Sequence, residues 1–162
     1  MLLSSLLRAL PAHEIQNAHD IDISHITDDS RDVKPGAMFV AYRGVNVDGA
    51  RFIPDAIQRG AVAIVAESRI TELPNLPIIT VPNGRSALAY LNAAWFGFPS
   101  RKMRVIGVTG TDGKTTTCAL IASILRAAGH RVGAITTVNA QIGEKEIDTG
   151  FHTTTPDAPR RD

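Results

Sequence analysis

The sequence predicts an α/β protein made of two consecutive domains. Apolar runs of strand length alternate with helical patterns up to residue 96, which is typical of a small α/β domain. From residue 105 an apolar run leads through a glycine-rich turn into a further helical pattern, the first β-loop-α-β unit of a domain with a parallel sheet. A connector over residues 97–102 contains Pro99, so we expect the domains to span residues 1–100 and 101–162.

Three apolar runs in the first domain have the length of buried strands. They cover residues 37–41, 61–66 and 78–81. Gly60 precedes the second run, and prolines at positions 74, 77 and 82 bracket the third. We therefore expect all three to be short strands inside the core.

Three helices are predicted in the same domain, over residues 2–10, 53–59 and 83–96. The first carries five leucines on one face at helical spacing. The third starts with Asn83, a favourable N-cap residue, and must end near Phe96 because Pro99 follows.

The second domain is predicted to begin with the strand 105–109. The helix behind the glycine-rich turn ends at Gly129, and residues 131–135 return as a strand. Its apolar face consists of Cys118, Ile121, Leu125 and Ala128. Such a unit requires a right-handed crossover and a parallel pair of strands. Because two strands and one helix are too few to cover both faces of a parallel sheet, we expect one face to be exposed.

The composition argues against several classes of protein. The chain has 162 residues, with 17 Lys and Arg against 16 Asp and Glu, a formal net charge of +1. This balance gives no electrostatic reason to expect nucleic acid or an anionic membrane as a partner. The leucine-rich start is far shorter than the ~20 apolar residues of a membrane span. Cys118 is the only cysteine, which excludes an internal disulfide and favours a cytoplasmic location.

The turn from Gly110 to Thr116 has the residue types that hold a polyphosphate. Gly110 and Gly113 allow the backbone to curl so that N–H groups point inward, and the following helix adds its positive end. Lys114 would reach the β and γ phosphates, and the hydroxyl of Thr115 is where such loops ligate Mg²⁺. The predicted ATP-binding residues are Gly110, Thr111, Asp112, Gly113, Lys114, Thr115 and Thr116.

Two features of this turn leave alternatives open. The standard pattern has a glycine where this chain has Val108, so the loop is a shorter variant, and an ordinary strand-to-helix turn is the plainer interpretation. The carboxylate of Asp112 would repel phosphate if it faced the cradle. We expect Asp112 to point outward and to cap the local turn.

Several motifs together resemble the Mur ligase family, the ATP-dependent amide-bond ligases of peptidoglycan assembly. The segment 105–117, VIGVTGTDGKTTT, is similar to the ATP-binding loop of that family. The resemblance covers about Ile26 to Asp157, and its other motifs are Asp29-Ser-Arg31, Pro35-Gly36, Phe39-Val40, Gly44, Asp48-Gly49, Phe52-Ile53 and Thr154-Thr-Pro156. They resemble the branch that adds the third residue of the stem peptide to a UDP-muramoyl-dipeptide.

The resemblance implies a role for each matching position. Ser30, with Val45, Asn46 and Val47, would contact the UDP part of the substrate, although many members have a histidine where this chain has Val45. Thr154 and Thr155 would hold the muramoyl-dipeptide side. Such ligases phosphorylate the substrate carboxylate with ATP, and the amine of the incoming amino acid then attacks the acyl phosphate. Lys114 and Mg²⁺ would offset charge on the transferred group.

Plainer interpretations exist for the substrate residues. Ser30 in the segment TDDSR is equally typical of a turn, and the threonines before Pro156 are typical of a helix N-cap. Cys118 is better explained as a core residue than as a nucleophile. The spacing of His13, His19 and His25 matches no metal-ligand pattern.

The resemblance also implies that further parts of such a ligase lie outside these residues. Family members have a complete central domain and a C-terminal domain that binds the amino acid, so we expect a fragment that does not ligate alone. Two other functions remain open. One is a non-catalytic module that binds a nucleotide or UDP-sugar. The other is a different ATP-dependent amide ligase, such as a folylpolyglutamate or cyanophycin synthetase, although the motifs before the phosphate loop favour the muramoyl branch.

Overall fold

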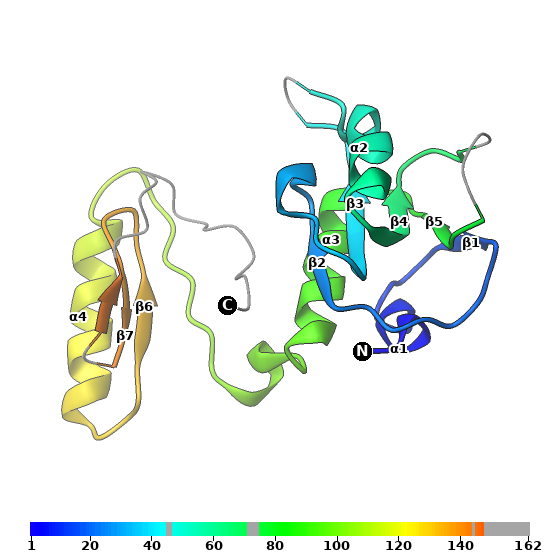
Figure 1. Ribbon diagram of the computed structural model, residues 1–162. Coiled ribbons are helices and arrows are strands. Elements are labelled where there is room, and N and C mark those ends of the chain that lie inside the picture. The colour runs from blue at the N-terminus through cyan, green and yellow to red at the C-terminus, as the bar shows by residue number, and fades with distance from the viewer. Residues whose placement is uncertain (45–46, 71–74, 144, 148–162) are drawn as a thin grey trace. The chain divides into compact units, whose positions relative to one another are not determined.

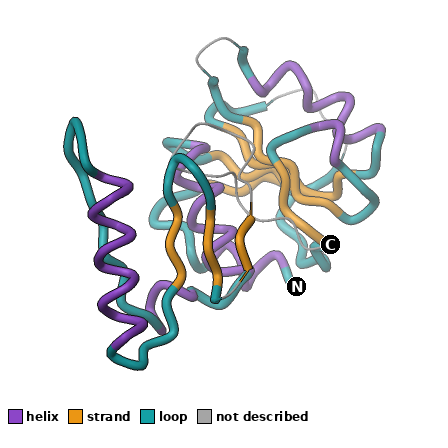
Figure 2. Tube along the Cα trace, turned by 90° about the vertical axis from the view of Figure 1, so that its left-hand side faces the viewer, coloured by secondary structure: helices purple, strands orange, loops and turns teal. Residues whose placement is uncertain are grey.

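A computed structural model describes residues 1–44, 47–70, 75–143 and 145–147. The chain divides into two compact units, Met1–Met103 and Arg104–Asp162 (Figure 1). Each unit has its own β-sheet, as the strands in Figure 2 show.

The first unit is built around a five-stranded sheet. Its strands are β1 (Glu14–Gln16), β2 (His25–Thr27), β3 (Ala37–Ala41), β4 (Ala61–Ala66) and β5 (Ile78–Thr80), in the spatial order β1-β5-β4-β3-β2. The pairs β2 with β3, β3 with β4 and β4 with β5 are parallel, and only β1 pairs antiparallel, with β5. Strands β3 and β4 match the predicted runs, which confirms the α/β fold class.

Helices cover both faces of this sheet. Helices α1 (Leu3–Leu7) and α3 (Gly84–Trp95) pack on one face, where Leu6, Leu91 and Val65 belong to one core cluster. Helix α2 (Ile53–Gln58) packs on the other face, where Ile53 and Phe39 belong to a second cluster. Since every residue of β3 is buried, its continuous apolar sequence is explained by cover on both sides.

Local signals in the sequence account for the helix ends. The side chain of Asn83 accepts a hydrogen bond from the amide of Ser86 at 2.8 Å, which is the predicted N-cap of α3. Gly60 follows α2 with a φ of +102°, and a Cβ there would lie 2.9 Å from Cα of Pro35. Only glycine fits this position, so α2 stops where the sequence predicted.

The first helix and the edge strands differ from the sequence prediction. Helix α1 is shorter than the predicted range 2–10. Leu2 forms an isolated antiparallel bridge with Asp22, and after Leu7 the amides of Ala9 and Leu10 bond to carbonyls three residues earlier, as turns. Strands β1 and β2 were not predicted. Each has three residues and no fully buried one, so neither carries an apolar run.

The second unit contains helix α4 (Lys114–Ala127) and a three-stranded antiparallel sheet. The strands β6 (Gly133–Ile135), β7 (Ala140–Ile142) and β8 (Lys145–Ile147) are neighbours in chain order. Helix α4 begins at the predicted position and packs on β6.

The predicted strand over residues 105–109 is not formed. The segment belongs to no strand, and the side chain of Val105 is 73% exposed. Accordingly, the predicted parallel pair with residues 131–135 is wrong for the described residues, because β6 pairs antiparallel with β7 instead. A parallel strand pair is stable only where helices or further strands cover it, and the described part of this unit supplies one helix.

The expected exposed face belonged to a parallel sheet that is not formed, but helix α4 has an exposed apolar side of its own. Ala122 is its only buried residue among those described, whereas Leu120 and Ile124 are 60% and 67% exposed. Their side chains form an apolar stripe that is largely exposed in the described part of the unit. None of the described helices combines the length and the apolar character needed to cross a membrane.

Candidate functional site

The phosphate loop of the second unit has the backbone geometry that its glycines predict. Gly110 and Gly113 have φ values of +149° and +74°, which side-chain-bearing residues rarely adopt. Gly113 is also the N-cap of α4, and no side chain caps the first turn. The first amides of a helix have no acceptor within the helix, so this end of α4 offers N–H groups to an anion.

Lys114 is already directed back over the loop. Its Nζ donates hydrogen bonds to the carbonyl oxygens of Gly110 at 2.6 Å and Thr111 at 2.9 Å. These contacts place the ammonium group on the inner side of the turn. Hydrogen bonds from an ammonium to phosphate are stronger than those to a neutral carbonyl, so a polyphosphate can replace these partners.

The other polar residues of the loop are open to solvent. Thr115 and Thr116 are exposed in the first turn of α4, where a hydroxyl can reach a bound metal ion. Asp112 is exposed as expected, but its carboxylate makes no hydrogen bond to another described residue, so the proposed turn cap is not seen there. Among the described residues, no three acidic, histidine or cysteine side chains lie close enough together to bind a metal ion.

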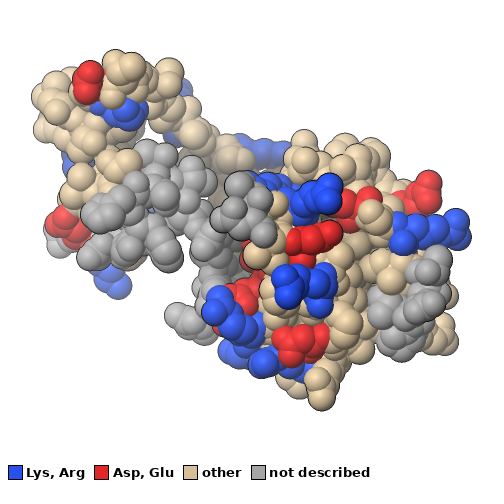
Figure 3. All heavy atoms as spheres, turned by 90° about the horizontal axis from the view of Figure 1, so that it is seen from above, with Lys and Arg blue, Asp and Glu red and all other residues tan. Residues whose placement is uncertain are grey.

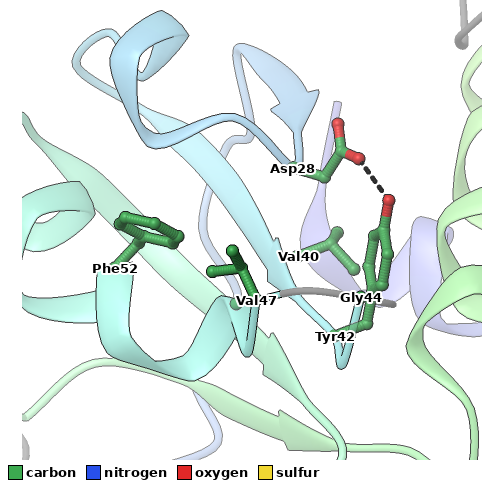
Figure 4. Close-up of a pocket in the computed structure, with 7 residues that line it drawn as sticks. Asp28, Val40, Tyr42, Gly44, Val47 and Phe52 are labelled. Atoms are coloured by element: carbon green, nitrogen blue, oxygen red, sulfur yellow. Dashed lines mark hydrogen bonds between the residues drawn. The ribbon is translucent and has the colours of Figure 1, made fainter.

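A hollow in the first unit lies where β2 and β3 end. Its volume is about 160 Å³, and its lining residues are Asp28, Val40, Tyr42, Gly44, Val47, Gly49 and Phe52 (Figure 4). Asp28 follows β2, and Tyr42 follows β3. Because β2 and β3 are parallel, their carboxyl ends meet at one edge of the sheet, the usual place for a ligand in open α/β sheets.

A polar pair forms one wall of this hollow. The hydroxyl of Tyr42 donates a hydrogen bond to the carboxylate of Asp28 at 2.7 Å (Figure 4). The guanidinium of Arg85, in the first turn of α3, lies 5.3 Å from the centre of the Tyr42 ring. Val47 and Phe52 supply the apolar part of the lining. The hollow can therefore receive a flat group that has both an apolar face and polar edges.

Ser30 does not line the hollow. The residue is 7% exposed, and its side chain hydrogen-bonds to the carboxylate of Asp55 on α2. Arg59 donates to the same carboxylate at 3.0 Å, and these two hydrogen bonds, Arg59 first, lower the pKa of Asp55. Ser30 thus joins the turn after β2 to α2.

The other predicted substrate residues divide into two groups. Val47 lines the hollow. Val45, Asn46, Thr154 and Thr155 lie outside the described residues. Asp28 and Tyr42 were not singled out from the sequence. Tyr42 follows the predicted strand β3, whereas Asp28 follows β2, for which the sequence has no signal.

Backbone hydrogen bonds hold the segment after β3 that contributes Gly44, Val47 and Gly49 to the hollow. The amide of Gly44 donates to the carbonyl of Val47 at 2.8 Å, and the amide of Gly49 donates to the carbonyl of Tyr42 at 3.0 Å. A Cβ at Gly49 would lie 2.7 Å from that carbonyl oxygen, so a larger residue would push the segment away. Asp48 caps the following 3₁₀ turn through the amide of Ala50 at 2.9 Å.

Charges on the first unit are mixed in sign. Figure 3 shows basic and acidic side chains interspersed on the visible face of this unit. The first unit therefore presents no extended field of one sign on that face.

A glycine-rich turn that leads into a helix, together with an α/β unit that has a hollow at its strand ends, is typical of nucleotide-binding proteins. The sequence matches the Mur ligase family catalytic domain over residues 22–95 and the Mur ligase middle domain over residues 108–160. The chain belongs to the Mur ligase family.

Relatives from several bacteria agree with this assignment. The chain is 48% identical over 140 residues to the UDP-N-acetylmuramyl-tripeptide synthetase of Roseiflexus sp. (strain RS-1), with 85% of this chain and 27% of that protein covered. It is 43% identical over 145 residues to the UDP-N-acetylmuramoyl-L-alanyl-D-glutamate–2,6-diaminopimelate ligase of Geobacillus thermodenitrificans (strain NG80-2), covering 90% of this chain and 29% of that protein. The chain thus spans less than a third of the length of these two relatives.

A solved structure links the fold to a nucleotide. The MurF ligase from Thermotoga maritima, determined in complex with ADP, is similar with a TM-score of 0.50 and 31% sequence identity. The similarity covers 70% of this chain and 26% of that one. That MurF ligase therefore binds an adenine nucleotide.

Proposed function

We propose that this chain is part of an ATP-dependent ligase of peptidoglycan precursor synthesis. The reaction joins an amino acid, as the third residue of the stem peptide, to UDP-N-acetylmuramoyl-L-alanyl-D-glutamate. The phosphate loop carries this proposal, because its two positive-φ glycines, its uncapped helix end and its inward lysine occur together. The names of the relatives supply the substrate class.

In this proposal the second unit binds the triphosphate of ATP. The amides at the start of α4 and the ammonium of Lys114 would contact the phosphates, and the hydroxyl of Thr115 would contribute one ligand to Mg²⁺. ATP, when bound, supplies the phosphoryl group that activates the substrate carboxylate. Lys114 lowers the free energy of the transition state by standing close to the negative charge of the transferred group.

The first unit, in the same proposal, binds the UDP part of the substrate. The hollow, of about 160 Å³, is smaller than the ~300–1,000 Å³ pockets that take drug-sized ligands, which suits one ring rather than a whole nucleotide sugar. Val47 and Tyr42 would contact the uracil ring. Ser30 would support the site from the turn after β2, since its hydroxyl is engaged with Asp55. The assignment of Thr154 and Thr155 to the muramoyl-dipeptide, and the cytoplasmic location, stay predictions.

Separate titrations with UDP and with ATP plus Mg²⁺ test the proposal. Isothermal calorimetry on the 162-residue chain should detect both ligands. UDP binding alone would leave a UDP-sugar module without an ATP site, and ATP binding alone would favour the folylpolyglutamate or cyanophycin type of ligase. Binding of neither ligand would contradict the proposal.

A non-catalytic binding module is the second candidate. The exposed stripe of Leu120 and Ile124 favours it for the isolated chain, because a unit with an uncovered face does not hold its loop as rigidly as a closed domain. We expect the chain alone to release no phosphate when given both substrates and ATP. Substrate-dependent phosphate release would exclude the non-catalytic alternative.

A further inference from the structure

Glu67 is the first residue after strand β4, and its carboxylate holds two backbone amides from separate segments. Oε1 accepts a hydrogen bond from the amide of Gly84 at 2.8 Å, and Oε2 accepts one from the amide of Arg43 at 3.1 Å. Gly84 begins α3, whereas Arg43 directly follows Tyr42 of the hollow. One side chain therefore joins the ends of β3 and β4 to the start of α3.

The parallel register explains why Glu67 can reach both amides. Ala41 of β3 lies opposite Ala66 of β4, so the residues that follow these two strands leave the sheet side by side. Arg43 also forms an antiparallel bridge with Asp48, at the base of the segment that contributes Gly44 and Val47 to the hollow. Glu67 thus holds the base of this segment, although its own side chain does not line the hollow.

Close packing makes the anchor stiff. A Cβ at Gly84 would lie 2.5 Å from Cβ of Tyr42, so the start of α3 touches the backbone that carries the Tyr42 side chain. A carboxylate near the first turn of a helix is also favoured by the helix dipole. Each hydrogen bond of Glu67 therefore restrains the strand end on which the wall of the hollow is built.

We propose that Glu67 is a positioning residue for the UDP-binding hollow. It does not line the hollow, and it acts by fixing the backbone of Arg43 and Gly84 on either side of Tyr42. The proposal rests on the assignment of the hollow to the UDP part of the substrate. Without the carboxylate, two amides lose a charged acceptor, and Tyr42 and Val47 lose their defined positions.

Variants of Glu67 in the 162-residue chain test this role. Glu67→Ala removes both acceptors and should weaken UDP binding by about tenfold, which corresponds to ~1.4 kcal/mol. Glu67→Gln keeps one acceptor oxygen but turns an NH₂ group toward the other amide, so it should cause a smaller loss. The control is Glu14→Gln, which changes an exposed carboxylate on edge strand β1 of the same sheet and should leave the affinity unchanged.

Two further measurements separate positioning from a loss of folding. The affinity for ATP should stay unchanged, because the phosphate loop belongs to the other unit. Amide hydrogen exchange followed by NMR should become faster at Arg43, Gly44, Gly49 and Gly84, while the core of β4 keeps its protection. If Glu67→Ala does not fold, ATP affinity and amide hydrogen exchange are measured on Glu67→Gln instead, and these results decide whether Glu67 is a positioning residue.

The outcomes distinguish this proposal from the one on which it rests. Weaker UDP binding with local exchange changes and unchanged ATP binding supports Glu67 as a positioning residue. Wild-type UDP affinity in both variants overturns that role and leaves the UDP assignment intact. Exchange that rises throughout the first unit also overturns it, because Glu67 would then be a general stability residue. If the wild-type chain binds no UDP, the assignment of the hollow fails and this role fails with it.

Discussion

The two units differ in how completely their helices cover the sheet. In the first unit, α1 and α3 pack on one face and α2 on the other, and all residues of β3 are buried. In the second unit, α4 buries only Ala122 among the described residues, and Leu120 and Ile124 face solvent. The first sheet, covered by helices on both faces, is mostly parallel, and the second, on which α4 packs, is antiparallel. The difference teaches that an apolar segment becomes a parallel strand only where both of its faces can be buried.

The largest expected effect comes from the covered core. Phe39 of β3 is fully buried in the core cluster that includes Ile53 of α2, so Phe39→Ala leaves a cavity and should lower the free energy of unfolding by ~3–5 kcal/mol. The matched variant Ile124→Ala shortens an exposed side chain of α4 and should change it by less than ~0.5 kcal/mol. Urea denaturation followed by circular dichroism measures both. Equal losses of unfolding free energy in the two variants would show that the side chains of Phe39 and Ile124 are buried to the same extent.

The second effect tests the phosphate loop. Lys114→Ala removes the ammonium that now contacts the carbonyls of Gly110 and Thr111. Loss of a charged hydrogen-bond donor to phosphate, worth ~1.5–3 kcal/mol, should weaken ATP binding by about 10- to 100-fold. UDP binding to the first unit should not change. An unchanged ATP affinity, measured by calorimetry, would remove Lys114 from the site.

The phosphate loop and the hollow differ in how far they could be predicted. The loop is local: Gly110, Gly113 and Lys114 lie within five residues, and their backbone conformation follows from residue type. The hollow is not local. Asp28 and Tyr42 meet because β2 and β3 are neighbours, and the polar three-residue strand β2 has no signal in the sequence. The sequence also identified 105–109 as apolar, but not whether anything would cover it.

A smaller effect is expected at the start of α3. Asn83→Ala removes the side chain that accepts from the amide of Ser86, which should cost ~1 kcal/mol of stability. Because α3 begins next to Tyr42, this variant also tests whether a weaker helix start loosens the hollow. The midpoint of urea unfolding gives the stability. A change well below 0.5 kcal/mol, on the scale of ordinary surface substitutions, would show that Glu67 rather than Asn83 holds this end of the helix.

The smallest expected effect is the pH dependence of the contact between Ser30 and α2. The hydrogen bonds from Arg59 and Ser30 hold the pKa of Asp55 below its ordinary value of 3.8. A carboxylate whose pKa is lower in the folded state stabilises the protein above the unfolded pKa, and this contribution is lost as the pH falls through the folded value. The loss should therefore occur below about pH 4, and it should be small because Arg59 and Asp55 are both substantially solvent-exposed.

Asp55→Asn isolates this contribution, because asparagine has a similar size and does not titrate. The difference in unfolding free energy between wild type and Asp55→Asn should be constant near neutral pH and should shrink as the pH falls below 4. Urea unfolding at a series of pH values measures it. A difference that grows on acidification would reverse the sign. Folding would then raise the pKa of Asp55, which would contradict the stabilising hydrogen bonds from Arg59 and Ser30.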